Sequence, residues 1–405
     1  MSIKKTIVIV GGGASAIACA AHLDQTKYHI HIFEKNKALG RKLLVAGKGG
    51  FNLTHSEKIE TFIKRYTPAD FLKKTLLEFS NDDLRKWLEE IGIPTYVGSS
   101  KRVYPLPGIK PVEVLKAMEN VLEQKSVQIH FNKTWLGWEN SNRLVFQDGE
   151  TIETDYVVFA LGGGSWSVTG SDGSWLSLFK EKGIKTTAFQ ASNCAYKFNW
   201  KNDFINQYAG SPLKNIAISC ENTPNKWQKG EVVITQFGLE GNAIYALSPI
   251  IRKEIALNGK AKIYIDFKPS LSLEDVQHKL LDHRHKNISL ALKLDLKLSP
   301  AQIAVLKTVV SKDHFINASV LAEFIKKVPL TITGSGALDE AISTVGGISL
   351  DEVSNNFELK AMKNQYCIGE LLDWDAPTGG YLLQACFSMG VHLAKHFNEK
   401  TNETA

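Results

Sequence analysis

The sequence predicts an α/β protein built around a parallel sheet. Three observations support this class. A β-branched strand at 5–10 runs into a glycine-rich turn and an alanine-rich helix, and a second apolar strand before residue 160 also ends in glycines. The middle of the chain then changes from β-rich runs at 191–270 to helical patterns at 271–330. A chain of 405 residues has room for two or three domains.

The N-terminal segment carries the strongest pattern. Residues 5–10 form a continuous apolar run typical of a buried parallel strand, and residues 14–23 favour a helix. A second strand at 29–33 ends at Glu34. Strand, glycine turn, helix, strand and terminal acid follow in register, which indicates a Rossmann-like dinucleotide-binding unit.

Each residue of the glycine fingerprint has a physical role. Gly11 permits the tight turn, Gly13 lets the backbone approach a pyrophosphate, and the small Ala16 allows close packing of helix and strand. The helix N-terminus adds unpaired N–H groups and the positive end of a dipole. Glu34 lies 23 residues after Gly11, where a carboxylate accepts hydrogen bonds from ribose hydroxyls and disfavours a 2′-phosphate. This unit alone leaves FAD and NAD both open.

Composition excludes several other classes. Hydrophobic residues make up 43% of the chain and charged residues 22%, which are globular values. Five scattered cysteines without a C-x-x-C pair disfavour a disulfide scaffold, a zinc site and dithiol chemistry. No signal peptide and no apolar run of membrane-spanning length is present, so we expect a cytoplasmic protein that does not bind membranes.

The net charge of +6 is unevenly distributed. Residues 191–330 hold 19 Lys and Arg against 12 Asp and Glu, a balance of +7, whereas the remainder is nearly neutral. A lysine-rich solvated surface explains this excess most simply, and a specific anionic partner such as RNA is the alternative.

Further motifs identify the chain as similar to a known family. They lie at 40–55, at 235–243 and at 369–384, where a short strand is followed by a glycine turn that opens a helix. In this order they resemble the motifs of the HI0933-like/YhiN flavoproteins, which are NAD(P)/FAD-dependent oxidoreductases. The chain departs from the family pattern at Lys48, Gly50, Phe51, Gln236, Asn242, Ala376 and Leu382, as expected of a divergent branch.

The resemblance implies FAD as the cofactor and a Rossmann-like FAD/NAD(P)-binding domain formed by 1–190 and 331–405. The insertion at 191–330 would be a β-barrel-like domain with a helical subdomain. Residues implied at the pyrophosphate and adenosine are Gly11, Gly13, Ala14, Ser15, Glu34, Lys35 and, over the adenine, Trp135, for which core packing is an equal alternative. Residues implied along the ribityl chain and the flavin ring are Arg41, Lys42, Gly47, Asn52, Ala160, Gly162, Gly369, Glu370, Asp373, Gly379, Gly380, Tyr381 and Leu382.

The flavin would perform the redox chemistry, and the protein would supply position and electrostatics. Lys48 and Tyr381 are candidate catalytic residues, although a solvent-facing Lys48 is the simpler interpretation. Tyr104 is better explained by packing. No second glycine fingerprint is present, so NADH or NADPH would bind only transiently. His283 and His285 are spaced to point apart on a helix, so we expect no metal site.

Three functions are consistent with this pattern. The first is a reductase of an activated C=C bond in a small molecule. The second is an RNA-modifying flavoenzyme that uses the basic insertion to bind RNA. The third is a flavin redox sensor without enzymatic activity. The substrate and the oligomeric state are not encoded in any motif.

Overall fold

A computed structural model describes residues 4–46, 50–282 and 284–400. It divides into two compact units, one of residues 1–190 and 342–405 and one of residues 191–341. The sequence predicts an insertion at 191–330, and the second unit of the structure spans 191–341. Strand β17 (Val328–Ile332) pairs with β16 (Ala261–Asp266), and β18 (Gly334–Ser335) pairs with β12 (Tyr196–Lys197), so this stretch completes the sheet of the insertion. Residues 331–341 add Asp339 and Glu340, so the second unit holds 19 basic and 14 acidic residues, a balance of +5.

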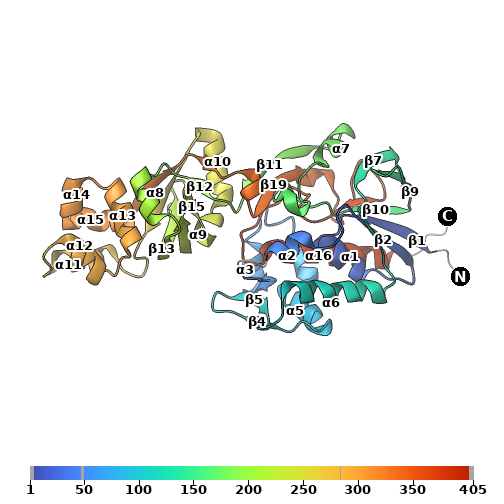
Figure 1. The fold of residues 1–405 in the computed structure, drawn as a ribbon, viewed down its shortest axis with the longest axis horizontal. Coiled ribbons are helices and arrows are strands. Elements are labelled where there is room, and N and C mark those ends of the chain that lie inside the picture. The colour runs from blue at the N-terminus through green and yellow to red at the C-terminus, as the bar shows by residue number, and fades with distance from the viewer. Residues whose placement is uncertain (1–3, 47–49, 283, 401–405) are drawn as a thin grey trace. The chain divides into compact units, whose positions relative to one another are not determined.

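The first unit is built on a five-stranded parallel sheet (Figure 1). The central strand is fully buried along its second half, as its β-branched run predicts. The last strand in the chain pairs in parallel with the strand before residue 160, so both ends of the chain complete this sheet, as expected. The order is β20 (Gln365–Cys367), β10 (Tyr156–Phe159), β1 (Lys5–Val10), β2 (Tyr28–Glu34) and β6 (Gln128–Phe131).

Two helices from opposite ends of the sequence pack together beside this sheet (Figure 1). These are α1 (Ala14–His22) and α16 (Tyr381–Glu399). A Cβ added to Gly390 would lie 2.5 Å from the carbonyl oxygen of Ser15, so the two backbones are in direct contact. Helix α1 packs against α16 and against α6 (Pro111–Gln124), and four of its alanines are buried: Ala16, Ala18, Ala20 and Ala21. Small residues on both helices therefore bring the C-terminal motif next to the N-terminal glycine turn.

Smaller elements complete the first unit. Three short sheets have the orders β3–β5–β4, β7–β8–β9 and β11–β19. Their strands are β3 (Thr54–His55), β4 (Thr95–Val97), β5 (Arg102–Pro105), β7 (Trp135–Asn140), β8 (Arg143–Phe146), β9 (Thr151–Glu153), β11 (Thr186–Ser192) and β19 (Ser343–Ile348). The remaining helices are α2 (Arg41–Ala46), α3 (Ile59–Ile63), α4 (Lys73–Glu78), α5 (Asn81–Glu90) and α7 (Leu176–Glu181).

The second unit has its own hydrophobic core and an antiparallel sheet of order β17–β16–β13–β14–β15–β12–β18. Ser272 and Ser299 accept hydrogen bonds from backbone N–H groups in the first turns of α11 and α13, as N-cap residues do. Its further elements are β13 (Pro212–Cys220), β14 (Gln228–Ile234), β15 (Gly238–Glu240), α8 (Asn202–Tyr208), α9 (Asn242–Tyr245), α10 (Ser248–Asn258), α11 (Leu273–Leu281), α12 (Ile288–Leu294), α13 (Pro300–Val309), α14 (Lys312–Ile316) and α15 (Ala318–Lys326).

Within the described ranges, no helix has both the length and the apolar character needed to cross a bilayer. All five cysteines are buried.

Candidate functional site

A cavity of about 430 Å³ lies in the first unit, where β1 and β2 end. Open α/β sheets bind their ligands at this edge, outside the carboxyl ends of the strands. The cavity contacts the glycine turn, the end of β2, the start of α2 and the first turns of α16. It brings together most of the residues implied at the cofactor: Gly11, Gly13, Ala14, Ser15, Glu34, Lys35, Arg41, Lys42, Trp135, Ala160, Gly162, Glu370 and Leu382.

Two glycines of the N-terminal turn have different surroundings. Gly11 has a φ of +103°, and an added Cβ would lie 2.4 Å from the carbonyl oxygen of Ala160. Gly13 has an ordinary φ of −83°, and an added Cβ would meet nothing within 4 Å. Gly13 also lines the cavity at the N-terminus of α1. The fold therefore needs Gly11, whereas the space at Gly13 is available to a ligand that approaches the backbone.

Glu34 is buried, and its carboxylate accepts hydrogen bonds from Gly12 and from Asn36. Its Oε2 accepts a hydrogen bond from the N–H of Gly12 at 2.7 Å, and its Oε1 accepts from the N–H and the side-chain amide of Asn36 at 2.8 and 2.6 Å. A carboxylate offers about four acceptor positions. Three are in use, so Glu34 has room for about one ribose hydroxyl.

Lys35 and Arg41 of the cavity wall bind neighbouring residues. Lys35 forms an ion pair with Asp172 at 2.8 Å, and Arg41 donates to the side-chain oxygen of Asn36 and to the carbonyl of Val168. Burial raises the pKa of Asp172, but hydrogen bonds from Lys35 and Ser174 hold it below its usual value.

Lys42 connects the two sequence motifs that meet at the cavity. Its Nζ lies 3.1 Å from Ser165 Oγ and 3.2 Å from Glu370 Oε2. Ser165 follows β10, Glu370 follows β20, and Lys42 belongs to α2. This contact joins segments that follow two neighbouring strands of the parallel sheet.

Two tryptophans line the cavity near the end of β2. The indole nitrogens of Trp135 and Trp175 are buried and have no hydrogen-bond partner within the described part of the chain. Trp135 also packs against Trp138 and Phe159, with ring centroids 4.7 and 4.8 Å apart. Trp135 is therefore a core residue that also forms part of the cavity wall, and its place over an adenine stays a prediction. A ligand with acceptor nitrogens, such as adenine, would suit this wall.

The cavity also meets the start of α16. Gly380 has a φ of +99°, and an added Cβ would lie 2.5 Å from the Thr54 backbone, so only glycine fits. The first hydrogen bond within α16 runs from the N–H of Gln384 to the carbonyl of Gly380. The N–H groups of the first turn lack partners inside the helix, and Leu382 of this turn lines the cavity.

Tyr381 does not line the cavity, because its side chain points into a polar cluster. Its hydroxyl donates to Glu57 Oε1 at 2.6 Å, and Arg65 binds both oxygens of Glu57 at 2.9 Å. Burial and the neighbouring Glu57 raise the pKa of Tyr381 well above its usual value. In this arrangement the phenolic proton is held by Glu57, and a catalytic role of Tyr381 stays a prediction.

Several other implied residues lie outside the cavity wall. Asp373 accepts a hydrogen bond from the N–H of Gly346, and an added Cβ on Gly369 would meet Ser15 Oγ at 2.6 Å. These two residues support the segments around the cavity. Asn52, Gly379 and Gly380 also do not line it. Gly47 and Lys48 lie outside the described residues.

Other cavity residues were missed by the sequence patterns. They include Asn36, Lys133, Ser171, Trp175 and Cys386. Ser171 lies in the run Gly170-Ser171-Asp172-Gly173, shortly after the second glycine cluster, and this polar glycine-rich run was a usable signal. Cys386 gave none, because its position depends on the rotation of α16.

The donor set fits FAD. Open space at Gly13, the amino end of α1, a nearly saturated Glu34 and two unpaired indole donors suit a pyrophosphate and an adenosine. The amino end of α16 suits the negative charge that a reduced flavin carries. Within the described residues, no group of three or more His, Cys, Asp or Glu side chains could hold a metal ion.

Comparison with known proteins gives one family and several relatives. Residues 5–396 match the model of the HI0933-like protein Rossmann domain. The chain is 24% identical to a 3-dehydro-bile acid delta(4,6)-reductase of Clostridium scindens, covering 95% of this chain and 97% of that protein. It is 23% identical to a ribosomal RNA dihydrouridine synthase of Haemophilus influenzae, covering 94% and 95%.

A solved structure shares the fold. It is a 3-ketosteroid-delta4-(5alpha)-dehydrogenase from Rhodococcus jostii RHA1, with 14% identity, a TM-score of 0.51 and 98% of each chain covered. The α/β fold class and the oxidoreductase class predicted from the sequence are confirmed by these matches.

Proposed function

The chain belongs to the HI0933-like family, which confirms the resemblance seen in its motifs, and we propose that it binds FAD and reduces an activated C=C bond of a small molecule. The observation that carries this proposal is the cavity at the end of β1 and β2. There the open space at Gly13, the buried Glu34 and the amino ends of α1 and α16 surround one volume. FAD, when bound, supplies the two-electron redox chemistry.

The residues of the chain would bind and orient the cofactor. The N–H groups at the start of α1 would bind the pyrophosphate, and Glu34 would accept one ribose hydroxyl. Lys42, which binds Glu370 and Ser165, would keep these two residues of the cavity region in place. The first turn of α16 would stabilise negative charge at its end of the cavity.

The bond class rests on the names of two relatives. A delta(4,6)-reductase and a dihydrouridine synthase both refer to a ring that gains hydrogen across a C=C bond. For the present chain, NADH or NADPH would supply one hydride, and one proton from the protein or solvent would complete the addition of two hydrogens. The nicotinamide would bind transiently, since the sequence holds no second glycine fingerprint.

Anaerobic reduction tests the proposal. Purified protein would be mixed with NADH and, separately, with NADPH while the visible absorbance of bound flavin is followed. Bleaching by either nucleotide, followed by recovery when a cyclic enone is added, is the expected result. Protein that holds no flavin and cannot be reconstituted with FAD would contradict the proposal.

A second candidate is reduction of a base in RNA. It is favoured by the relatives that are named ribosomal RNA dihydrouridine synthases and by the +5 balance of residues 191–341. Lys and Arg side chains would neutralise phosphates, so affinity would fall steeply with salt. Charge reversal of Lys and Arg residues within 252–297 should abolish salt-dependent RNA binding. Unchanged or salt-insensitive binding would argue against this candidate.

A further inference from the structure

One face of the three-stranded sheet β3–β5–β4 combines aromatic and basic side chains. In its antiparallel ladder His55 lies opposite Arg102, and Tyr96 lies opposite Tyr104. Residues opposite each other share a face, and Arg102 and Tyr104 alternate with the fully buried Val103. These four residues, His55, Tyr96, Arg102 and Tyr104, therefore lie on the same side, which we call the Arg102 face.

The Arg102 face lies beside the turn that opens α16. Thr54 of β3 contacts Gly380, the residue before α16. A Cβ added to Gly379 would lie 3.5 Å from Arg102 Nε. Leu382, two residues after Gly380, already lines the cavity described above. The guanidinium is thus close to the end of the cavity where the first turn of α16 lies.

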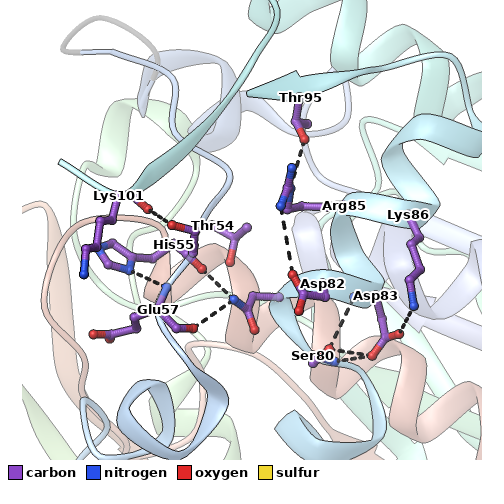
Figure 2. Close-up of polar contacts among 12 residues, drawn as sticks. Thr54, His55, Glu57, Ser80, Asp82, Asp83, Arg85, Lys86, Thr95 and Lys101 are labelled. Carbon is purple, nitrogen blue, oxygen red and sulfur yellow. Dashed lines mark hydrogen bonds and ion pairs between the residues drawn. The ribbon is translucent and has the colours of Figure 1, made fainter. Parts of the chain in front are cut away.

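The guanidinium of Arg102, unlike those of Arg65 and Arg85, has no acceptor bound to it within the described residues. Arg65 binds Glu57 through two hydrogen bonds. Arg85 contacts Thr95 and Asp82, as Figure 2 shows. Arg102 takes part in none of the ion pairs or side-chain hydrogen bonds found among residues 4–46, 50–282 and 284–400. A planar guanidinium without a partner is a good donor to a carbonyl or carboxylate oxygen.

The aromatic part of the face is preorganised. The rings of Tyr96 and Tyr104 stack with centroids 5.7 Å apart and an interplanar angle of 28°. Tyr96 is 40% exposed, so this pair is not closed within the core. Aromatic surfaces of this kind pack against planar rings.

His55 is held in place and does not add a charge. Its Nδ1 accepts a hydrogen bond from the N–H of Glu57, so the ring proton lies on Nε2 (Figure 2). Burial lowers the pKa of His55, which keeps the ring neutral near neutral pH. Its ring stacks on Tyr381 at 5.3 Å, and Asn81 donates to its carbonyl. Arg102 is therefore the cation of this face.

We propose that the Arg102 face binds the substrate, a planar ring in which a C=C bond is conjugated to a carbonyl. Arg102 donates hydrogen bonds to the carbonyl oxygen, and the ring packs against Tyr104. This inference rests on the proposed reductase function, because it requires the reducible bond to lie near the start of α16. Two sources share this chemistry, a cyclic enone of a steroid and the uracil ring of a nucleoside.

Calorimetric binding distinguishes these sources. FAD-loaded protein would be titrated separately with progesterone and with uridine. Binding of one of them is expected, and Arg102→Gln should weaken it roughly 10- to 100-fold, the loss typical of a hydrogen bond to a charged group. Lys101→Gln removes the neighbouring exposed charge and should leave the affinity unchanged. Arg102→Lys keeps the charge without the planar fork and should weaken binding to a smaller extent.

Two results would overturn the inference. One is wild-type protein that binds neither probe. The other is a folded Arg102→Gln variant with wild-type affinity for the probe that binds. The FAD dissociation constant, measured for each variant, separates this inference from the proposed function. Loss of FAD binding in the wild type would remove the proposed function, whereas Arg102-dependent binding of a probe to cofactor-free protein would still support the face.

Discussion

The contrast between two glycines of the N-terminal turn gives a sharp prediction. Gly13→Ala should leave the fold intact and weaken FAD binding, whereas Gly11→Ala should damage the fold itself. Alanine at 13 meets nothing within 4 Å and keeps an ordinary φ. Alanine at 11 would lie 2.4 Å from a backbone oxygen of Ala160 at a φ of +103°.

The magnitudes follow from these environments. At Gly13 the variant changes only the helix cap, which costs at most about 1 kcal/mol. If its methyl group displaces the pyrophosphate from even one backbone N–H, a charge-assisted hydrogen bond of about 1.5–3 kcal/mol is lost, which lowers FAD affinity roughly 10- to 100-fold. At Gly11 the unfavourable φ alone costs about 1–2 kcal/mol, and the overlap with the Ala160 carbonyl adds to this.

The assay separates stability from binding. Unfolding of cofactor-free protein in urea gives the change in stability, and quenching of FAD fluorescence on binding gives the dissociation constant. A Gly13→Ala variant with wild-type affinity for FAD would refute the placement of the pyrophosphate at the start of α1. A Gly11→Ala variant as stable as the wild type would refute the described turn.

Three further predictions concern charged groups of the first unit. Glu34→Gln keeps the shape but removes the charge and one acceptor, so FAD affinity should fall by roughly 1–3 kcal/mol in the same fluorescence assay, and unchanged affinity would exclude a ribose contact. Lys42→Met leaves Glu370 without its cation and should lower stability, while Lys42→Met with Glu370→Gln should recover part of the loss in thermal unfolding; additive losses would show that the pair does not interact. Burial raises the pKa of Glu57 but its hydrogen bonds from Arg65 and Tyr381 lower it below 4.5, so its ionised form stabilises the fold above about pH 4.5 and this contribution is lost as pH falls through the folded pKa. The stability difference between wild type and Glu57→Gln in urea should therefore be constant above that pH and shrink below it; a difference that grows on acidification would contradict the assignment.

Much of the first unit could be predicted because its signals are local. The strand at 5–10, the helix that follows it and the strand that ends at Glu34 each depend on residues adjacent in sequence. The glycine turn before α16 is equally local, since Gly380 adopts a φ that other residues avoid. These local patterns were sufficient to locate the cavity and most of its wall.

Features that depend on distant segments were not predictable from the pattern. Glu57 accepts a hydrogen bond from Tyr381, which lies more than 300 positions later in the sequence, and no local pattern near either residue predicts this contact. Residues 331–341 belong to the second unit but contain no strong strand pattern, because the pairing of β18 depends on the distant β12. The Arg102 face likewise depends on the strand register, which a short alternating run cannot fix.

The pairing of β20 with β10 has a consequence for biosynthesis. A ribosome-bound chain that has emerged only as far as residue 341 already contains β10, but not the strand that covers its outer edge or the helix that packs on α1. An unpaired strand edge readily joins other chains. The cavity can be completed only after translation has passed the insertion, so nascent chains that stall within residues 191–341 should be clients of chaperones.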